Sequence, residues 1–470
     1  MSWRKILFWI HLGAGLVAGL VILVMSVTGA LIAFEKALVA WAEGDNRRVL
    51  TNPSADPSPR LQVLWDRVTH DHGRPPVALT VHADPSLAVE VLMGRNEVMF
   101  WDPGTEDLRP SRAQSLRKAM ATLTAWHRWL GLEGPYRSWG KSVTGACNLA
   151  FVLLILTGSI LWWPALRNRR AWNLRLWFQR GLRGRSRDWN WHHVVGFWCG
   201  PVLLILSGSA IVISYAWASR WVEGIGSASS SSAPSPRAEA ALRSAQGPVA
   251  SRASAMSLDT LWEQVRAATP QWERITIRFG GGRPGGPLEG TSPARPRSER
   301  PQEHGSPAGG TSPASRNRSA AENHTPPSRA TAPTDATAPA VTFAVRERGA
   351  WPLFAVTQMQ VHPQTGEVLS VQRFGDLPPG RRLRMWLRYL HTGEAMGWPG
   401  QLAAMGASIG GAVLVWTGLA LSWRRFIRPR GRRDVDESGD PSLKGEVPGS
   451  LSVQDTDKKT QRTASEIRED

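Results

Sequence analysis

The sequence predicts an α-helical membrane protein with four transmembrane helices in two pseudo-repeats, each repeat carrying an α+β module outside the membrane. Three observations indicate this fold class. Apolar residues are concentrated in four long blocks, basic residues gather beside alternate ends of those blocks, and one pattern of histidines and glycines occurs in both halves of the chain. Long uncharged stretches are typical of bilayer-spanning helices, and a recurring pattern indicates a repeated architecture.

The apolar blocks cover residues 6–34, 143–163, 194–216 and 402–423. Each is almost free of charged side chains and is long enough for the core of a bilayer, which about 20 helical residues span. A core helix of a soluble protein is usually shorter and amphipathic. The first block is also too long for the apolar region of a signal peptide, which reaches about 15 residues. We therefore predict four transmembrane helices.

The placement of the basic residues predicts the orientation of these helices. The net charge is +18, and arginines crowd the loop at 164–193 and the segment that follows residue 423, while Arg4 and Lys5 precede the first block. The positive-inside rule makes these the cytoplasmic ends. The expected topology is N-in and C-in with two large loops on the other side. The basic clusters are predicted to contact lipid headgroups rather than nucleic acid.

The two large loops follow one plan. In each, a helix-patterned segment (61–70 or 258–268) precedes short strands and then a second helical segment that carries His127 or His391. Residues 280–340 are dominated by Gly, Pro, Ser, Ala, Thr and Arg, a composition typical of disorder. The predicted organisation is a transmembrane helix at 6–34, a module with its connector helix at 35–142, a transmembrane helix at 143–163, a basic cytoplasmic loop at 164–193, a transmembrane helix at 194–216, a module with the insertion at 217–401, a transmembrane helix at 402–423 and a disordered cytoplasmic tail at 424–470.

The histidine and glycine pattern of the first block recurs in the third. The pattern His11-x3-Gly15-x3-Gly19 matches His192-x3-Gly196-x3-Gly200, and Ser207-Gly208 is interpreted as the counterpart of Thr28-Gly29. The second and fourth blocks carry Thr157-Gly158 and Thr417-Gly418. Small residues at this spacing let helices approach closely. They also make room for a flat cofactor between helices, and the sequence leaves both interpretations open.

Histidines within hydrophobic spans are costly and usually have a partner or a function. His11 and His192 are predicted at similar depth near the cytoplasmic face, with His193 beside them, and His127 and His391 at the opposite face. Imidazoles that face each other across a helical bundle suit a b-type haem, which takes two axial nitrogens. We therefore predict that His11, His192, His127 and His391 bind the iron of two haems b per chain, and that His193 is a further cofactor-binding residue.

Two considerations qualify this hypothesis. These histidines could instead cap helix ends or bind lipid headgroups, and the second pair can form only if the chain folds back at residues 131–135. No Cys-x-x-Cys-His sequence is present, so covalent attachment of the c type is excluded.

The chain also resembles a known family. The motifs are IHLGAGLVAGL with VTGALIAF, WHRWLGL with LTGSILWWP, HHVVGFW with LSGSAIVIS, and YLHTGEAMG with WTGLALSWRR. They resemble the PepSY-associated transmembrane (PepSY-TM) family of bacterial inner-membrane proteins, often called iron-regulated. EVMFWDPGTEDL and MQVHPQTGEVLS are similar to the closing hairpin of PepSY modules, although Glu106 stands where that turn usually has Gly and His362 where it has Asp.

The resemblance implies a bacterial inner-membrane location with periplasmic PepSY-like modules. Some members look like haem-containing reductases that carry electrons to ferric siderophores. We therefore expect an inner-membrane b-type haem oxidoreductase that passes electrons to a periplasmic ferric-siderophore or similar metal complex in iron uptake. Because no Rossmann-type glycine fingerprint is present, a quinol or a partner dehydrogenase is the expected electron donor. Soluble PepSY modules inhibit proteases, so the alternative is a non-enzymatic sensor or protease regulator.

Overall fold

The computed structural model of the chain describes residues 2–50, 59–94, 96–163, 169–226, 256–279 and 341–426. The insertion expected at 280–340 lies outside the described residues, as does the tail from residue 427 onwards. The chain divides into two compact units, Met1–Ser422 and Trp423–Asp470, and all packing contacts given below lie within the first.

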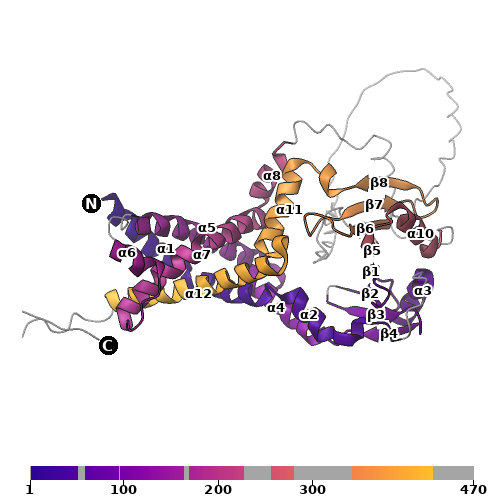
Figure 1. The fold of residues 1–470 in the computed structure, drawn as a ribbon, viewed down its shortest axis with the longest axis horizontal. Helices are drawn as coiled ribbons and strands as arrows, with labels where there is room; N and C mark the ends of the chain where they lie inside the picture. The colour runs from indigo at the N-terminus through magenta and orange to yellow at the C-terminus, as the bar shows by residue number, and fades with distance from the viewer. Residues whose placement is uncertain are drawn as a thin grey trace, which may run out of the picture. The chain divides into compact units, whose positions relative to one another are not determined.

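Four of the described helices are long and apolar enough to cross a membrane. They are α1 (Trp3–Ile32), α5 (Arg137–Trp162), α7 (Gly184–Ser214) and α12 (Gly397–Phe426), drawn in Figure 1. The four predicted spans fall on these helices, and the prediction of a multi-pass membrane protein is confirmed. The end of the bundle where α1 begins is called the N-terminal end, and the end where α1 leads towards the strands is called the sheet end.

Helix α7 begins earlier than the sequence suggested. It starts at Gly184 instead of residue 194, so His192 and His193 lie inside the helix and not in the loop expected at 164–193. Asn190, in its first turns, is buried and donates to the carbonyls of Leu174 (2.6 Å) and Trp177 (3.1 Å). These bonds satisfy the amide group of Asn190, a polar residue in the segment that was expected to be a loop. They also hold the segment containing α6 (Arg169–Leu176) against the helix.

Short connector helices lie at the sheet end. They are α2 (Glu35–Glu43) with η1 (Gly44–Arg47), α4 (Gln114–Trp129) with η2 (Gly134–Tyr136), α8 (Ala216–Gly224), and α11 (Pro379–His391) with η7 (Glu394–Met396). The chain reverses after α4 through left-handed Leu130 (φ 55°), Gly131 (φ 70°) and Gly134 (φ 57°), and α4 contacts both α1 and α5. The fold-back that the second histidine pair requires is therefore present.

The strands form one antiparallel sheet of eight in the order β4-β3-β2-β1-β5-β6-β7-β8. The strands are β1 (Ala78–His82), β2 (Val89–Leu92), β3 (Val98–Asp102), β4 (Asp107–Pro110), β5 (Trp272–Arg278), β6 (Val341–Glu347), β7 (Thr357–Val361) and β8 (Val368–Gln372). The first four come from one loop and the last four from the other. They join where β1 pairs with β5, with Leu79 opposite Ile277.

Two helices, α3 (Leu61–His72) and α10 (Leu258–Ala268), cover one face of this sheet (Figure 1). Alternate strand residues point to this face and are fully buried, among them Leu79, Ile277 and Phe343. Each helix caps the other: Asp259 Oδ1 accepts from the amide of Leu61 (2.6 Å), and Gln62 Oε1 from the amide of Leu258 (3.1 Å). The two sets of strands therefore share one continuous core.

The two hairpin turns that depart from the PepSY pattern both use left-handed backbone. Glu106 has φ 54° in the turn between β3 and β4, and Gly366 has φ 69° in the turn between β7 and β8. A glycine adopts this conformation without strain, whereas another L-residue costs roughly 1–2 kcal/mol. The turn keeps its shape in spite of Glu106, whose carboxylate accepts from Arg60 Nη1 at 2.8 Å.

Candidate functional site

The structure brings His11 of α1 and His192 of α7 together near the N-terminal end of the bundle. Their ring centroids are 6.5 Å apart with an interplanar angle of 86°. His11 Nδ1 lies 2.8 Å from the hydroxyl of Thr157 on α5, and His192 Nδ1 lies 2.9 Å from that of Thr417 on α12. We call these two side chains the first pair.

The hydroxyls fix the tautomer of the first pair. Thr157 Oγ1 donates its own proton to the carbonyl of Leu153 (2.7 Å), and Thr417 Oγ1 donates to that of Val413 (2.7 Å). Each hydroxyl oxygen therefore accepts from the imidazole, so Nδ1 carries the proton. The Nε2 lone pair is then the one available to a ligand, an arrangement typical of metal-binding histidines.

His127 of α4 and His391 of α11 form a second pair at the sheet end. Their ring centroids are 6.2 Å apart. His127 Nδ1 donates to the carbonyl of Met25 (2.9 Å), with the Thr28 hydroxyl at 3.1 Å. His391 Nδ1 donates to the carbonyl of Leu206 (2.9 Å), with the Ser209 hydroxyl at 3.3 Å. A carbonyl can only accept, so Nδ1 again carries the proton and Nε2 is left for a ligand.

Burial keeps the second pair neutral. It lowers the pKa of His127 to about 4, an effect that a charge on His391 would reinforce. Burial also lowers the pKa of His391, and the nearby guanidiniums of Arg128 and Arg388 act in the same direction. Both rings are therefore uncharged at neutral pH, which is the form that binds metals.

The dipeptides Thr157-Gly158, Thr417-Gly418 and Thr28-Gly29 lie against the imidazole rings of His11, His192 and His127. We call each such contact surface the seat of its ring. A side chain on Gly158 would approach His11 Cε1 at 3.3 Å, one on Gly418 would approach His192 Cε1 at 3.6 Å, and one on Gly29 would approach His127 Cε1 at 3.2 Å. In each seat a threonine hydroxyl lies beside the ring nitrogen. The following glycine relieves a tight contact with the ring carbon at Gly158 and Gly29, whereas a side chain on Gly418 would make an ordinary van der Waals contact. The dipeptides thus have a specific task beyond general helix packing.

The fourth seat differs from the sequence-based interpretation. The hydroxyl beside His391 belongs to Ser209, not to Ser207, and Ala210 follows it where the other seats have glycine. Ser209 stands at the same distance along the chain from His192 as Thr28 does from His11. The counterpart of Thr28 is therefore Ser209, and the assignment of Ser207-Gly208 was wrong by two residues. The Ser207 carbonyl accepts from Asn148 Nδ2 at 2.9 Å.

His193 lies beside His192, with ring centroids 6.2 Å apart, but its Nδ1 is bound outside the first pair. Its Nδ1 donates to the carbonyl of Trp189 at 2.8 Å, and its ring packs on the indole of Trp189 with centroids 4.0 Å apart. Across the described ranges, no group of three or more His, Cys, Asp or Glu side chains is placed to hold a metal ion. The candidate metal-binding units are therefore the two imidazole pairs.

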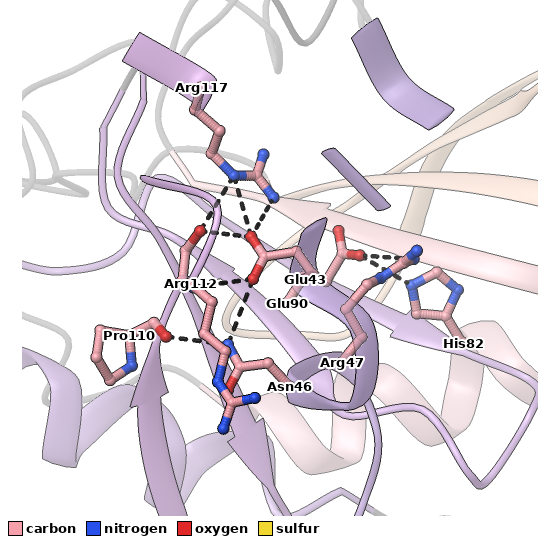
Figure 2. Close-up of polar contacts among 9 residues, drawn as sticks. Glu43, Asn46, Arg47, His82, Glu90, Pro110, Arg112 and Arg117 are labelled. Carbon is pink, nitrogen blue, oxygen red and sulfur yellow. Dashed lines mark hydrogen bonds and ion pairs between the residues drawn. The ribbon is translucent and has the colours of Figure 1, made fainter. Parts of the chain in front are cut away.

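A buried carboxylate, which the sequence analysis missed, fastens α4 to the end of α2 (Figure 2). Glu43 is 1% exposed and accepts hydrogen bonds from the Ser111 hydroxyl, the amide of Arg112 (3.0 Å) and Arg117 Nη2 (3.1 Å). Burial alone would raise the pKa of Glu43, but hydrogen bonds from Ser111, Asn46 and Arg117 outweigh it and lower the pKa. Nothing in the sequence marked this glutamate as buried, because it follows an apolar helix and precedes a polar segment.

Figure 2 also labels a second acid, Glu90, with its own partners. Glu90 on β2 accepts from Arg47 Nη2 at 3.3 Å, and its Oε1 lies 3.6 Å from His82 Nε2 on β1. Burial acts to raise the pKa of Glu90, but His82 and Arg47 lower it overall. The arrangement neutralises the carboxylate on the face of the sheet opposite α3 and α10, and it stabilises the loop that follows α2.

These features define a four-span membrane protein that carries a mixed α/β region outside the bundle and paired histidines within it. The chain belongs to the family described as the PepSY-associated TM region, whose model matches residues 8–425. A comparison with curated proteins finds no match.

Proposed function

We propose that this protein is a b-type haem oxidoreductase of the bacterial inner membrane that passes electrons to a periplasmic ferric-siderophore or similar metal complex. His11 and His192 would hold one haem, and His127 and His391 the other. Each haem would supply one-electron redox chemistry. The positive-inside rule favours an N-in, C-in orientation, which places the first pair towards the cytoplasm and the sheet in the periplasm.

The geometry of the pairs carries this proposal. Two imidazoles bound to one iron from opposite sides have ring centroids roughly 6 Å apart, because each metal–nitrogen bond is about 2 Å long and each centroid lies about 1 Å beyond its nitrogen. The observed separations are 6.5 and 6.2 Å. Packing alone would not require four partly buried histidines that all engage Nδ1 and leave Nε2 to a ligand.

The positions of the pairs along α1 support electron transfer across the membrane. His11 lies on this helix, and the seat of His127 is built from Met25 and Thr28 of the same helix. At 1.5 Å per residue the two levels are roughly 20–25 Å apart. The hydrocarbon core of a bilayer is about 30 Å thick. Two redox groups at these levels would lie near opposite faces of the bilayer and together span most of its hydrocarbon core.

We also propose that the two halves are pseudo-repeats with PepSY-like modules. The spacing from His11 to Thr28 equals that from His192 to Ser209, and α2 and α4 correspond in order to α8 and α11. The module of the first half contributes α3 with β1–β4, and that of the second contributes α10 with β5–β8. These modules are suited to position the metal complex near the second pair, and a quinol or dehydrogenase would supply electrons to the first.

Proteoliposomes provide the functional test. The full chain, expressed with added haem, is reconstituted with dithionite trapped inside and a ferric hydroxamate complex outside, and ferrous iron is followed with a chromogenic chelator. The proposal expects reduction that depends on both pairs, so that His11→Ala and His127→Ala each fall to the rate of protein-free vesicles. If vesicles holding haem-loaded protein reduce no faster than empty ones, the proposal fails, and the sensor or protease-regulator alternative becomes the better account.

A further inference from the structure

The loop between β6 and β7 exposes a large apolar side chain. Residues 350–354 of this loop have the sequence AWPLF, which carries no charge. Trp351 is 68% exposed, whereas Phe354 is 6% exposed. A single exposed apolar residue is ordinary, but a contiguous apolar surface marks a site of interaction. The surroundings of Trp351 therefore decide its role.

Aromatic contacts hold this loop against α11. The ring of Phe354 stacks on that of Tyr389, with centroids 4.2 Å apart and an interplanar angle of 9°, and it meets the ring of Trp386 edge-on at 5.1 Å. Trp351 also contacts Trp386, with centroids 6.1 Å apart. The last residue of α11, His391, binds a carbonyl of α7. The loop is therefore fixed beside the transmembrane helices, although it connects two strands of the sheet.

The same loop touches the start of α12. Leu353 Cδ1 is 3.4 Å from the position that a Cβ would take on Gly397, the first residue of α12. One exposed apolar surface, here called the loop–α12 surface, is thus formed by Trp351, Leu353, Met396 and Trp398. The last three of these side chains are 37%, 64% and 69% exposed. The surface joins a loop of the sheet to the first turn of a transmembrane helix.

The position and the charge of the loop–α12 surface indicate its partner. Exposed indoles at the ends of transmembrane helices lie at the level of the lipid headgroups. Trp398 stands at such an end, and so do Trp217 and Trp221, which are exposed on α8 directly after α7. The nearby carboxylate of Glu394 pairs with Lys36 at 2.6 Å. The surface therefore offers apolar area at headgroup depth, which fits a bilayer rather than a charged partner.

We propose that residues 350–354 dock on the membrane, with Trp351 inserted among the lipid headgroups beside Trp398. The bilayer covers the loop–α12 surface and ties the second half of the sheet to the membrane. Because Phe354 stacks on Tyr389, docking also steadies α11. The attraction comes from burial of apolar side chains, so zwitterionic lipid is sufficient. The contact depends neither on haem nor on the proposed reductase activity.

Depth-dependent quenching in nanodiscs tests this contact. A fluorescent amino acid is incorporated at position 351 of the full chain, and the phosphatidylcholine of the nanodisc carries a nitroxide either near the headgroup or near the end of the acyl chain. Position 398 is the reference at the end of α12. Position 364 is the exposed control in the turn at the other end of β7, about 15 Å from the loop at 3.3 Å per strand residue.

We expect the headgroup nitroxide to quench positions 351 and 398 to a similar degree, and about threefold or more as strongly as position 364. Quenching at position 351 no stronger than at position 364 would overturn the proposal. Stronger quenching at position 351 by the deep nitroxide would overturn the headgroup location. Emission that is shifted to the blue but insensitive to both nitroxides would also overturn it, in favour of a protein surface such as a second copy of this chain.

A second arrangement leaves the side chain at position 351 natural or nearly so, and it decides the outcome if the first variant is not monodisperse on gel filtration. The fluorophore is placed at position 350, and Trp351 is then replaced. Trp351→Asp should lower the quenching to the level of position 364, because a carboxylate is costly to insert into lipid. Trp351→Phe, which keeps a ring against Trp386, should retain it. Equal quenching in these two variants would contradict the insertion of Trp351.

Discussion

In both histidine pairs a hydroxyl group and a main-chain carbonyl lie beside Nδ1 of each ring. The two pairs differ in which of these groups is the nearer one. In the first pair the nearest partner of each Nδ1 is a threonine hydroxyl, at 2.8 and 2.9 Å, and the carbonyls of Leu154 and Leu414 lie beside the rings as secondary partners. In the second pair the nearest partner is a main-chain carbonyl at 2.9 Å, and the hydroxyl is the more distant one.

The pairs also differ in what positions the rings. His11 and His192 belong to transmembrane helices, so packing of the bundle sets their separation. His127 and His391 belong to the connector helices α4 and α11, which must dock on the bundle. Glu43 holds α4 through a fully buried carboxylate, whereas α11 is held by the exposed ion pair of Glu223 with Arg384 at 2.6 Å and by a main-chain bond from the Gly380 amide to the Ile225 carbonyl at 3.0 Å. The second pair is therefore the one that should respond to changes outside the membrane.

Replacing one histidine of either pair should have the largest effect. We expect His192→Ala and His391→Ala each to remove one haem and to leave the other, because the pairs share no ligand. Haem content per chain, measured as the pyridine haemochrome, tests this. His193→Ala is the control and should keep both haems, since its ring packs on Trp189. Unchanged content in both ligand variants would refute the pairing.

Replacing Glu43 should destabilise the second pair and spare the first. Glu43→Ala leaves Arg117 without its buried partner, at a cost of about 3 kcal/mol. Glu223→Ala removes an exposed ion pair and should cost about 1 kcal/mol or less. Thermal release of haem, followed by absorbance, reports the difference. Equal effects of the two substitutions would show that burial of Glu43 does not hold α4.

Acidification should weaken the contact between Glu43 and α4. Because the pKa of Glu43 is lowered from its ordinary value of 4.5, its stabilising contribution is complete above that pH and is lost as the pH falls through the lowered value. We expect the second pair to lose haem before the first on acidification, and Glu43→Gln to remove that part of the pH dependence. The spectrum recorded during an acid titration distinguishes the two sites.

The hydroxyl seats should matter more for the first pair. Thr157→Val removes the nearest partner of His11, and loss of such a partner typically weakens metal binding 10–100-fold. Ser209→Ala leaves the Leu206 carbonyl at 2.9 Å from His391, so we expect a change of about threefold or less. Haem affinities from titration of the apoprotein provide the measurement. A larger effect of Ser209→Ala would reverse the order of partners inferred above.

The smallest effect is expected from the glycine seats. A side chain in Gly29→Ala would approach His127 Cε1 at 3.2 Å, which the ring can relieve by shifting a few tenths of an ångström. We expect a loss of only a few-fold in the haem affinity of the second pair, because an overpacked contact of this kind relaxes easily. Ala210→Gly should be neutral, since His391 is already accommodated beside alanine. A haem-free second site in Gly29→Ala would show that the ring cannot adjust.

Much of this architecture could be predicted from the sequence, for physical reasons. Uncharged runs long enough for a bilayer are unambiguous, and the chain order of the helices placed His11 and His192 at one level and His127 and His391 at the other. The approach of these side chains is a finding of the structure, while their binding of haem stays a prediction. The family resemblance rested on motifs that the family model also matches.

Other features depend on contacts that the order of residues does not reveal. The pairing of β1 with β5 joins segments from separate loops, so two expected modules became one sheet. Ser207-Gly208 resembled Thr28-Gly29 in its letters, but the helical position facing His391 belongs to Ser209. Glu43 became important only through Ser111 and Arg117, which lie far along the chain.

The haem content of the purified protein tests the central claim most directly. The full chain is expressed with adequate haem supply, purified in detergent, reduced with dithionite and examined by absorbance. We expect an α-band typical of iron with two imidazole ligands and about two haems per chain, one for each histidine pair. A folded, monodisperse preparation that contains no haem would contradict the account.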